Sequence, residues 1–169
     1  MLQSPPPSPH FSWQGKIGLA YPLILFLGQP VINTTGEYAL RAIVAIAQAH
    51  PNSRTTAQLA NITKVPAGYL SKVLQSLTRA GLITSQRGLG GGFLLAQPAR
   101  RIRTLDVLEA VGAAPQRITK CPLGIVGHTE LCPVHRMLDD AIARTEKALT
   151  AADLETLCRS TNGIQPLCE

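Results

Sequence analysis

Apolar residues recur at helical spacing in several stretches of the chain, and each stretch predicts a helix with one buried face. The clearest stripe consists of Leu70, Val73, Leu74 and Leu77. Pro66 stands where the first turn of this helix tolerates proline, and Gly81 stands just past its end, as a C′ glycine does. Further helices are expected at about residues 35–49, 57–63, 105–111, 133–150 and 154–158. Thr55 or Thr56 is expected to cap the helix at 57–63, and Thr104 the helix at 105–111.

Two short apolar segments on either side of a glycine-rich sequence predict a β-hairpin. The expected strands run from Leu82 to Gln86 and from Phe93 to Ala96, and the tip between them reads Arg-Gly-Leu-Gly-Gly-Gly. The helix at 57–63, the turn after it and the helix that begins near Pro66 form a helix-turn-helix. A helix-turn-helix followed by a hairpin is a winged helix.

The glycines of the hairpin tip have an alternative interpretation as a phosphate-binding loop. A nucleotide-binding loop of the Walker type requires Gly-Lys-Ser or Gly-Lys-Thr, which this tip lacks. A dinucleotide-binding fingerprint opens a helix, whereas these glycines continue into Phe93-Leu-Leu-Ala and then Pro98. The context therefore favours a wing, and a flexible hairpin without a function is the remaining alternative.

Charge is divided unevenly between the two halves of the chain. The 169 residues carry a formal net charge of +6 and 45% hydrophobic residues, which is enough for one compact domain. From Tyr38 to Leu105 there are nine Lys or Arg and no Asp or Glu, whereas residues 106–169 carry six basic and nine acidic residues. A helical unit with one sign of charge and a basic loop favours a polyanionic partner such as DNA.

The polar face of the helix after Pro66 carries small, polar and cationic residues and no acid. Lys and Gln side chains reach phosphates or base edges, and small residues let a helix backbone approach a groove. We therefore predict that the major groove of double-stranded DNA is contacted by Tyr69, Ser71, Lys72 and Gln75. The predicted contacts to the DNA backbone or minor groove are Arg87, Gly90 and Gly91. The alternative is an ordinary solvated helix face.

Several motifs together resemble one known family. They read TTGEYALRAIVAIA, GYLSKVLQSLTRAGLI, RGLGGGFLLAQP and IRTLDVLEAVG. Over about Ile32 to Leu157 the chain resembles the Rrf2 family of bacterial winged-helix transcriptional regulators. The fold class is therefore predicted as mainly α with a small β-hairpin wing, a winged helix-turn-helix with a long C-terminal dimerisation helix. The resemblance implies a homodimer that binds a palindromic operator. An apolar seam for the dimer is offered by Met137, Leu138, Ala141, Ile142 and Leu149.

The loop before the long helix concentrates side chains that bind metals. Cys121, His128, Cys132 and His135 are spaced as Cys-x6-His-x3-Cys-x2-His. Pro133 suits the first position of the helix, so Cys132 is expected at its N-cap, where the helix end lowers the pKa of a thiol. His135 follows within one turn on the same side.

The resemblance suggests which of these residues are ligands. Cluster-binding members of the family carry three cysteines in this loop, and this chain has two. Cys121 and Cys132 correspond to the outer pair, His135 to a histidine ligand, and His128 lies near the missing middle cysteine. Glu37 corresponds to an acidic cluster ligand of some relatives.

Three interpretations of this site remain open. They are a [2Fe–2S] cluster held by thiolates and imidazoles, a zinc site of two cysteines and two histidines, and a site without metal whose thiols are redox-active or structural. The predicted function is a dimeric regulator that senses redox state, nitric oxide or iron–sulfur status through a cluster in the 121–135 loop. The alternative is a winged-helix repressor with a structural zinc or no metal, which responds to another signal or none.

An enzyme is not expected, because no nucleophile accompanied by a base and no recognisable pair of catalytic carboxylates is present. Asp139 and Asp140 are expected on the exposed face of the dimerisation helix. Four cysteines without a credible signal peptide do not indicate a secreted disulfide framework, so the bacterial cytoplasm is the expected location. Cys158 is expected to be a small core residue.

The chain is divided into four parts on these grounds. Residues 1–30 are proline-rich and then apolar, and they are expected to be a disordered extension or to precede a true start near Val31. Their apolar run is interrupted by Pro22 and is too short to span a membrane. Residues 31–103 are expected to form the winged-helix DNA-binding region, 104–158 the sensor loop and dimerisation helix, and 159–169 a flexible tail.

Overall fold

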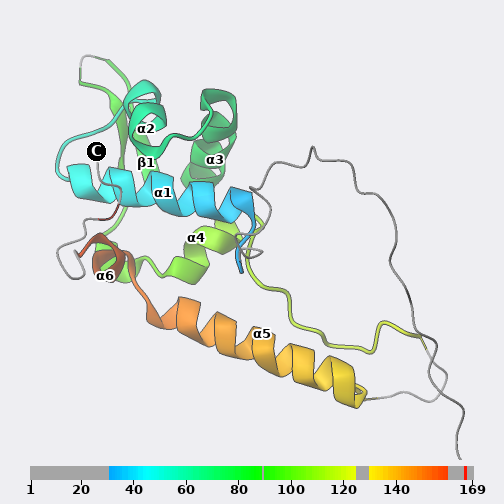
Figure 1. Cartoon of the computed structure of the whole chain (residues 1–169). Coiled ribbons are helices and arrows are strands. Elements are labelled where there is room, and N and C mark those ends of the chain that lie inside the picture. The colour runs from blue at the N-terminus through cyan, green and yellow to red at the C-terminus, as the bar shows by residue number, and fades with distance from the viewer. Residues whose placement is uncertain (1–30, 89, 125–129, 160–165, 167–169) are drawn as a thin grey trace, which may run out of the picture.

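The computed structural model describes residues 31–88, 90–124, 130–159 and 166 (Figure 1). The expected extension at 1–30 and nearly all of the expected tail lie outside these residues. The helices are α1 (Thr34–Ala49), α2 (Thr56–Thr63), α3 (Ala67–Arg79), the 3-10 helix η1 (Ala99–Arg101), α4 (Thr104–Ala110), α5 (Pro133–Ala151) and α6 (Leu154–Cys158). The strands are β1 (Ile83–Gln86) and β2 (Gly92–Leu95). The predicted fold class is confirmed, with element boundaries that differ by a residue or two.

Helix α1 lies at the centre of the fold. It packs against α2, α3 and β2 on one side and against α4 and α6 on the other (Figure 1). The predicted stripe of α3 is buried against it, and each fully buried leucine contributes roughly 1.5–3 kcal/mol. A Cβ on Gly36 would lie 2.5 Å from the side chain of Ile32 and 2.8 Å from that of Leu108. Glycine at this position therefore allows α4 to approach the start of α1.

The turn of the helix-turn-helix is held from within and from α1. Lys64, at the end of α2, adopts a left-handed conformation with φ 56°. Thr63 is buried, and its hydroxyl donates to the carbonyl of Leu59 at 2.7 Å. The guanidinium of Arg41 donates to the carbonyl of Thr63 at 3.3 Å. At the other end of α3, Gly81 has φ +72°, which confirms the expected C′ glycine.

The wing is an antiparallel hairpin to which a third segment is added. Ile83 pairs with Leu95 and Gln86 with Gly92. Arg54 pairs with Phe93 through two backbone hydrogen bonds of 2.9 and 3.2 Å. A Cβ on Gly92 would lie 2.6 Å from the carbonyl oxygen of Arg54, so this close approach requires glycine. The segment between α1 and α2 thus forms one edge of the wing.

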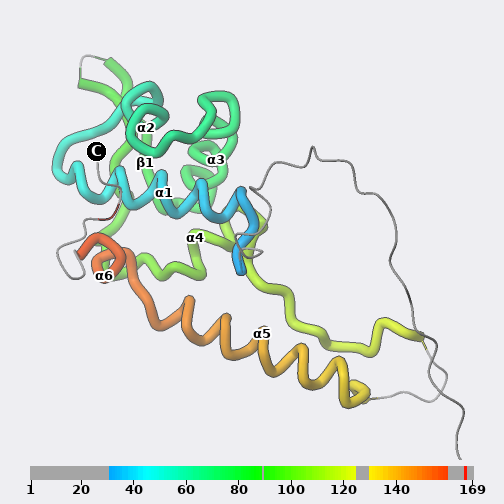
Figure 2. The backbone as a smooth tube through the Cα atoms, in the orientation of Figure 1, coloured from blue at the N-terminus to red at the C-terminus, as the bar shows by residue number. Residues whose placement is uncertain are grey.

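Helix α5 extends from the winged-helix body and packs against α4 (Figure 2). Its C-terminal end is fixed to the body. The backbone N–H and the hydroxyl of Thr104 both donate to the carbonyl of Ala152 at 2.9 Å, and the N–H of Leu154 donates to the carbonyl of Ile102 at 2.8 Å. The expectation that Thr104 caps α4 is therefore wrong. Arg103 is the N-cap residue, and the Thr104 hydroxyl is directed across the chain instead.

Asp139 and Asp140 differ in exposure, contrary to expectation. Asp140 is exposed, but Asp139 is 8% exposed because Arg117 and the backbone of Ile118 bind its carboxylate. Within α5, which is described in full, Asp139 is the one buried residue. The assignment of Asp139 to the exposed face is therefore wrong.

Candidate nucleic-acid interface and metal site

The exposed face of α3 carries the residues that the sequence predicts for the major groove. Because the leucine and valine stripe faces the core, Tyr69, Ser71, Lys72 and Gln75 are all exposed. The ring of Tyr69 meets that of Tyr38 edge to face, with centroids 5.8 Å apart and an interplanar angle of 79°. This contact supports Tyr69 from α1 while half of its surface remains accessible.

A groove of about 660 Å³ separates α3 from the wing. Its walls come from α2, α3 and both strands. They consist of Thr56, Ser71, Lys72, Leu74, Gln75, Thr78, Arg79, Ser85 and Phe93. The lining contains two cations, four hydroxyl groups and one amide, and no acid. Such a lining suits a phosphate backbone beside a helix that reads bases.

Four polar residues of this groove are absent from the predicted contacts: Thr56, Thr78, Arg79 and Ser85. Arg79 follows Gln75 by one helical turn, so the helical period alone indicates that it shares the groove face. Ser85 lies on β1, whose residues after Ile83 are all exposed. Thr56 carries no comparable local signal, because its place in the groove depends on how α2 packs against α3.

The backbone conformation of the wing tip requires glycines, independently of any contact with DNA. Gly88 and Gly90 adopt positive φ values of 96° and 78°. A Cβ on Gly91 would lie 2.6 Å from the carbonyl oxygen of Gln86 and 2.8 Å from that of Gly88. Arg87 and Gly90 are exposed. The hairpin turn therefore requires these glycines, and their contacts with DNA stay predictions.

A second candidate site forms where α5 begins. The ligand atoms of Cys121, Cys132 and His135 all lie within 4.8 Å of one another. The Nδ1 atom of His135 is 3.1 Å from the Sγ atom of Cys132 and 3.6 Å from that of Cys121. Cys132 is the N-cap residue of α5, with Pro133 at the start of the helix, as expected. The start of α5 thus supplies two ligand groups, Cys132 and His135, and the segment that precedes α5 supplies the third, Cys121.

The local environment favours the thiolate form of Cys132. The backbone N–H of His135 is the largest cause, followed by the His135 side chain, and together they lower the pKa of the Cys132 thiol to about 7 despite partial burial. A thiolate is the form that binds metals, and two sulfurs with one imidazole suit zinc or an iron–sulfur cluster. The residues present therefore fit such a group, with a fourth ligand still to be supplied.

The other two predicted ligands are His128 and Glu37. His128 lies outside the described residues. Glu37 lies on α1 and forms an ion pair with Arg41, which also donates to Thr63 at the helix-turn-helix turn. Glu37 is not among the three groups that the described structure brings together. Cys158 packs against the core, as expected, and burial raises the pKa of its thiol.

These features define a winged-helix protein in which α3 and the wing form a candidate nucleic-acid interface. Over residues 32–160 the chain matches the family described as Rrf2, iron-dependent transcriptional regulator. The chain belongs to this family, which confirms the resemblance. The family and the relatives below are transcriptional regulators, in agreement with the expectation that the chain is not an enzyme. No helix within the described ranges is both long and apolar enough to cross a membrane.

Known relatives agree with this assignment. The chain is 39% identical over 83 residues to the HTH-type transcriptional regulator IscR of Cereibacter sphaeroides, a match that covers 47% of this chain and 54% of that protein. The chain thus spans about half the length of that relative. T. potens IscR superposes with a TM-score of 0.64 at 21% identity, covering 77% of this chain and 86% of that one. CymR, the global cysteine regulator of B. subtilis, gives a TM-score of 0.62 at 23% identity, covering 76% and 96%.

Proposed function

We propose that this chain is a homodimeric transcriptional regulator that binds a palindromic operator in double-stranded DNA, and that a metal centre at Cys121, Cys132 and His135 adjusts its affinity. The observation that carries the DNA-binding part is the acid-free groove between α3 and the wing. Lys72 and Arg79 line this groove and Arg87 stands exposed at the wing. A cytoplasmic location follows from a DNA partner.

The dimer is supported by the outer face of α5. Val134, Met137 and Leu138 expose 60%, 63% and 43% of their surfaces, and all three lie in the first two turns of the helix. Ala141 continues this apolar side. A second copy of the chain would cover these side chains, and two-fold symmetry would present two α3 helices to two half-sites about one DNA turn apart.

The metal centre is supported by the donor set. Cys121 and Cys132 supply two thiolates and His135 supplies an imidazole, which are ligands for a [2Fe–2S] cluster or for zinc. A cluster would supply sensitivity to oxidants and nitric oxide, whereas zinc would supply structural order. Candidates for the fourth ligand are His128, Glu37 and a residue of the second copy of the chain. In this chain, the Cys132 N-cap holds its thiolate at the end of α5, which also forms the proposed dimer contact.

A regulator with structural zinc or without metal is the second candidate. The observation that favours it is the number of cysteines, because the loop carries two where cluster-binding members carry three. Both candidates share the DNA-binding groove and the dimer, and they differ in the content of the site.

One experiment separates the candidates. Protein purified without oxygen is examined by absorption spectroscopy and by iron, sulfide and zinc analysis, and its affinity for an operator selected from random DNA is measured by fluorescence anisotropy. We expect a coloured protein whose colour and operator affinity change in Cys121→Ala and Cys132→Ala, while the control Cys158→Ala behaves like the wild type. A colourless, metal-free protein that binds the operator equally well in all three variants would exclude the metal centre and leave the plain regulator.

A further inference from the structure

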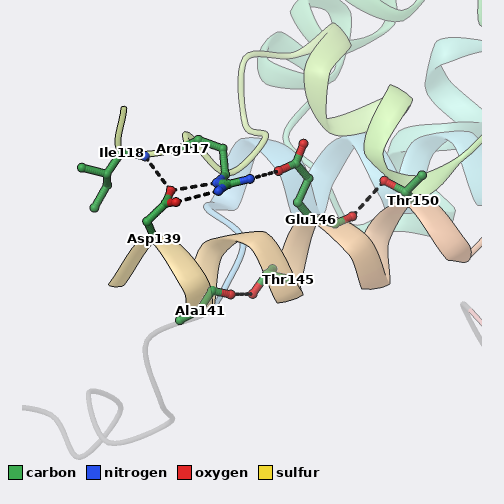
Figure 3. A network of polar contacts seen from close by, with 7 residues as sticks. All are labelled: Arg117, Ile118, Asp139, Ala141, Thr145, Glu146 and Thr150. Atoms are coloured by element: carbon green, nitrogen blue, oxygen red, sulfur yellow. Dashed lines mark hydrogen bonds and ion pairs between the residues drawn. The ribbon is translucent and has the colours of Figure 1, made fainter. Parts of the chain in front are cut away.

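The buried residue of α5 is an acid that binds a segment far away in the chain. The Nε and Nη2 atoms of Arg117 donate to the two carboxylate oxygens of Asp139 at 2.7 and 2.6 Å (Figure 3). The backbone N–H of Ile118 donates to the same carboxylate at 2.9 Å. A third nitrogen of Arg117 lies 3.8 Å from the carboxylate of Glu146, almost two turns further along α5. Residues 117 and 118 are thereby fastened to α5 by both side chain and backbone.

A buried carboxylate is costly unless its charge is compensated. Here a bidentate guanidinium and a backbone N–H compensate it, and Arg117 is the main reason that the pKa of Asp139 is lowered to about 2. The arrangement is geometrically specific, because a planar guanidinium fork matches a carboxylate in one orientation. Loss of Arg117 would leave the Asp139 carboxylate without a charge partner among the described residues, whereas loss of Asp139 would leave Arg117 with the more distant Glu146.

This attachment lies next to the metal site. Asp139 follows His135 by four residues, so the two side chains lie on the same face of α5, one turn or about 6 Å apart. Cys121 follows Ile118 by three residues, a reach of at most about 11 Å of chain. When Ile118 is bound at Asp139, the chain that leads to Cys121 starts one turn from His135. Without the bonds of Arg117 and Ile118 to Asp139, the described hydrogen bonds between residues 113–121 and α5 are reduced to the Cys121 contact with His135, beside the 3.8 Å ion pair of Arg117 with Glu146.

We propose that Asp139 and Arg117 are positioning residues that hold Cys121 against Cys132 and His135. They form a clamp, defined here as the contacts of Arg117 and Ile118 with Asp139, which brings the third ligand to the two that α5 provides. The inference rests on the proposed metal site for its function, but the placement of the two thiols is a property of the metal-free chain. It can therefore be measured without metal.

The test uses full-length protein in which Cys158 and Cys168 are replaced by serine. In the metal-free protein, the equilibrium between the two thiols and a Cys121–Cys132 disulfide is measured in buffers of reduced and oxidised glutathione. Oxidised glutathione accepts the two electrons and becomes two reduced molecules while the protein loses two thiol protons. The measured constant gives the effective concentration of one thiol at the other. Zinc affinity is measured separately by competition with a chromophoric chelator.

In Asp139→Asn we expect both the effective thiol concentration and the zinc affinity to fall by about 10- to 100-fold, the range known for residues that orient metal ligands. Arg117→Lys keeps the charge but loses the planar fork of the guanidinium, so the effective thiol concentration and the zinc affinity should fall less in Arg117→Lys than in Arg117→Gln. The matched control is Asp140→Asn, which removes a neighbouring exposed carboxylate that makes no hydrogen bond or ion pair within the described residues. It should leave both quantities unchanged.

The outcomes separate the clamp from the metal site. If zinc and iron do not bind the wild type, but Asp139→Asn still lowers the effective thiol concentration, the clamp stands and the metal site fails. If Asp139→Asn and Arg117→Gln are folded by circular dichroism and keep the wild-type effective concentration, the clamp is excluded. Should Asp139→Asn not fold, the two Arg117 variants decide by the same measurement.

Discussion

The hydroxyl of Ser53 donates a 2.6 Å hydrogen bond to the carbonyl oxygen of Gly90, and this bond ties the tip of the wing to the segment between α1 and α2. The neighbouring Arg54 pairs with Phe93 in the hairpin. The wing is therefore supported from a part of the chain 37 residues away, at the point where its own backbone is glycine-rich. Its position relative to α3 sets the width of the acid-free groove.

Ser53→Ala is expected to weaken operator binding while leaving the fold intact. Loss of one hydrogen bond of about 1 kcal/mol corresponds to a loss of affinity of up to about fivefold. Hydrogen exchange at residues 90–92 should become faster, because the tip is no longer held. Thr84→Ala, which removes an exposed hydroxyl from β1, is the control and should change neither quantity.

Lys72→Ala and Arg87→Ala are expected to lower operator affinity and to flatten its salt dependence. Each lost phosphate contact reduces the slope of log affinity against log salt by about 0.9. Titrations by fluorescence anisotropy at several salt concentrations give this slope. Lys147→Ala removes a cation from α5, outside the groove, and should keep the wild-type slope. If Lys72→Ala and Arg87→Ala both keep it as well, neither cation contacts DNA.

Met137→Glu is expected to convert a dimer into a monomer, because it places a charge on the most exposed of the large apolar residues of α5. Sedimentation velocity at micromolar concentration should show the change, together with weaker binding to a two-half-site operator and unchanged binding to a single half-site. Lys147→Glu, which is also on α5 but outside the hollow that Met137 and Ala141 line, serves as a control for the added negative charge. A monomeric wild type that binds the palindrome with full affinity would contradict the proposed dimer.

Alkylation of Cys132 in the metal-free protein should follow a pKa of about 7. The thiolate reacts and the thiol does not, so the rate with iodoacetamide should rise about tenfold per pH unit below pH 7 and level off above it. In His135→Ala the midpoint should move upward, since the imidazole contact is lost while the backbone N–H remains. Peptide mass spectrometry distinguishes Cys132 from Cys121. A midpoint near the ordinary value for cysteine in the wild type would show that the start of α5 does not stabilise the thiolate.

Local sequence signals account for much of this structure. The stripe of α3, the glycine after it, the proline that opens α5 and the wing each depend on neighbouring residues, and each is found where the pattern predicts it. The thiol and imidazole groups of Cys132 and His135 are brought together by one turn of helix, which is equally local.

The features that the sequence does not predict depend on partners far away in the chain. The helical pattern predicts that Asp139 is exposed, but in the structure Arg117, 22 residues earlier, binds its carboxylate. The local sequence predicts that the hydroxyl of Thr104 caps a helix, but in the structure it donates to the carbonyl of Ala152, 48 residues later. The lining of the groove by Thr56 likewise requires the packing of α2 against α3. Such contacts follow from tertiary packing rather than from a period or a capping motif.

The hydrogen bonds that join Thr104 to Ala152 place both ends of the segment 105–151 at one point of the winged-helix body. This attachment is the pivot for any rigid rotation of α5 relative to the body. The 19 residues of α5 span about 28 Å, and Cys132 and His135 lie at the end of the helix remote from the pivot. A rotation of about 5° at Ala152 would carry those ligand groups through about 2.5 Å, roughly the length of one metal–sulfur bond. A bond made or broken at this end of α5 is therefore matched in scale to a rotation of a few degrees at Ala152.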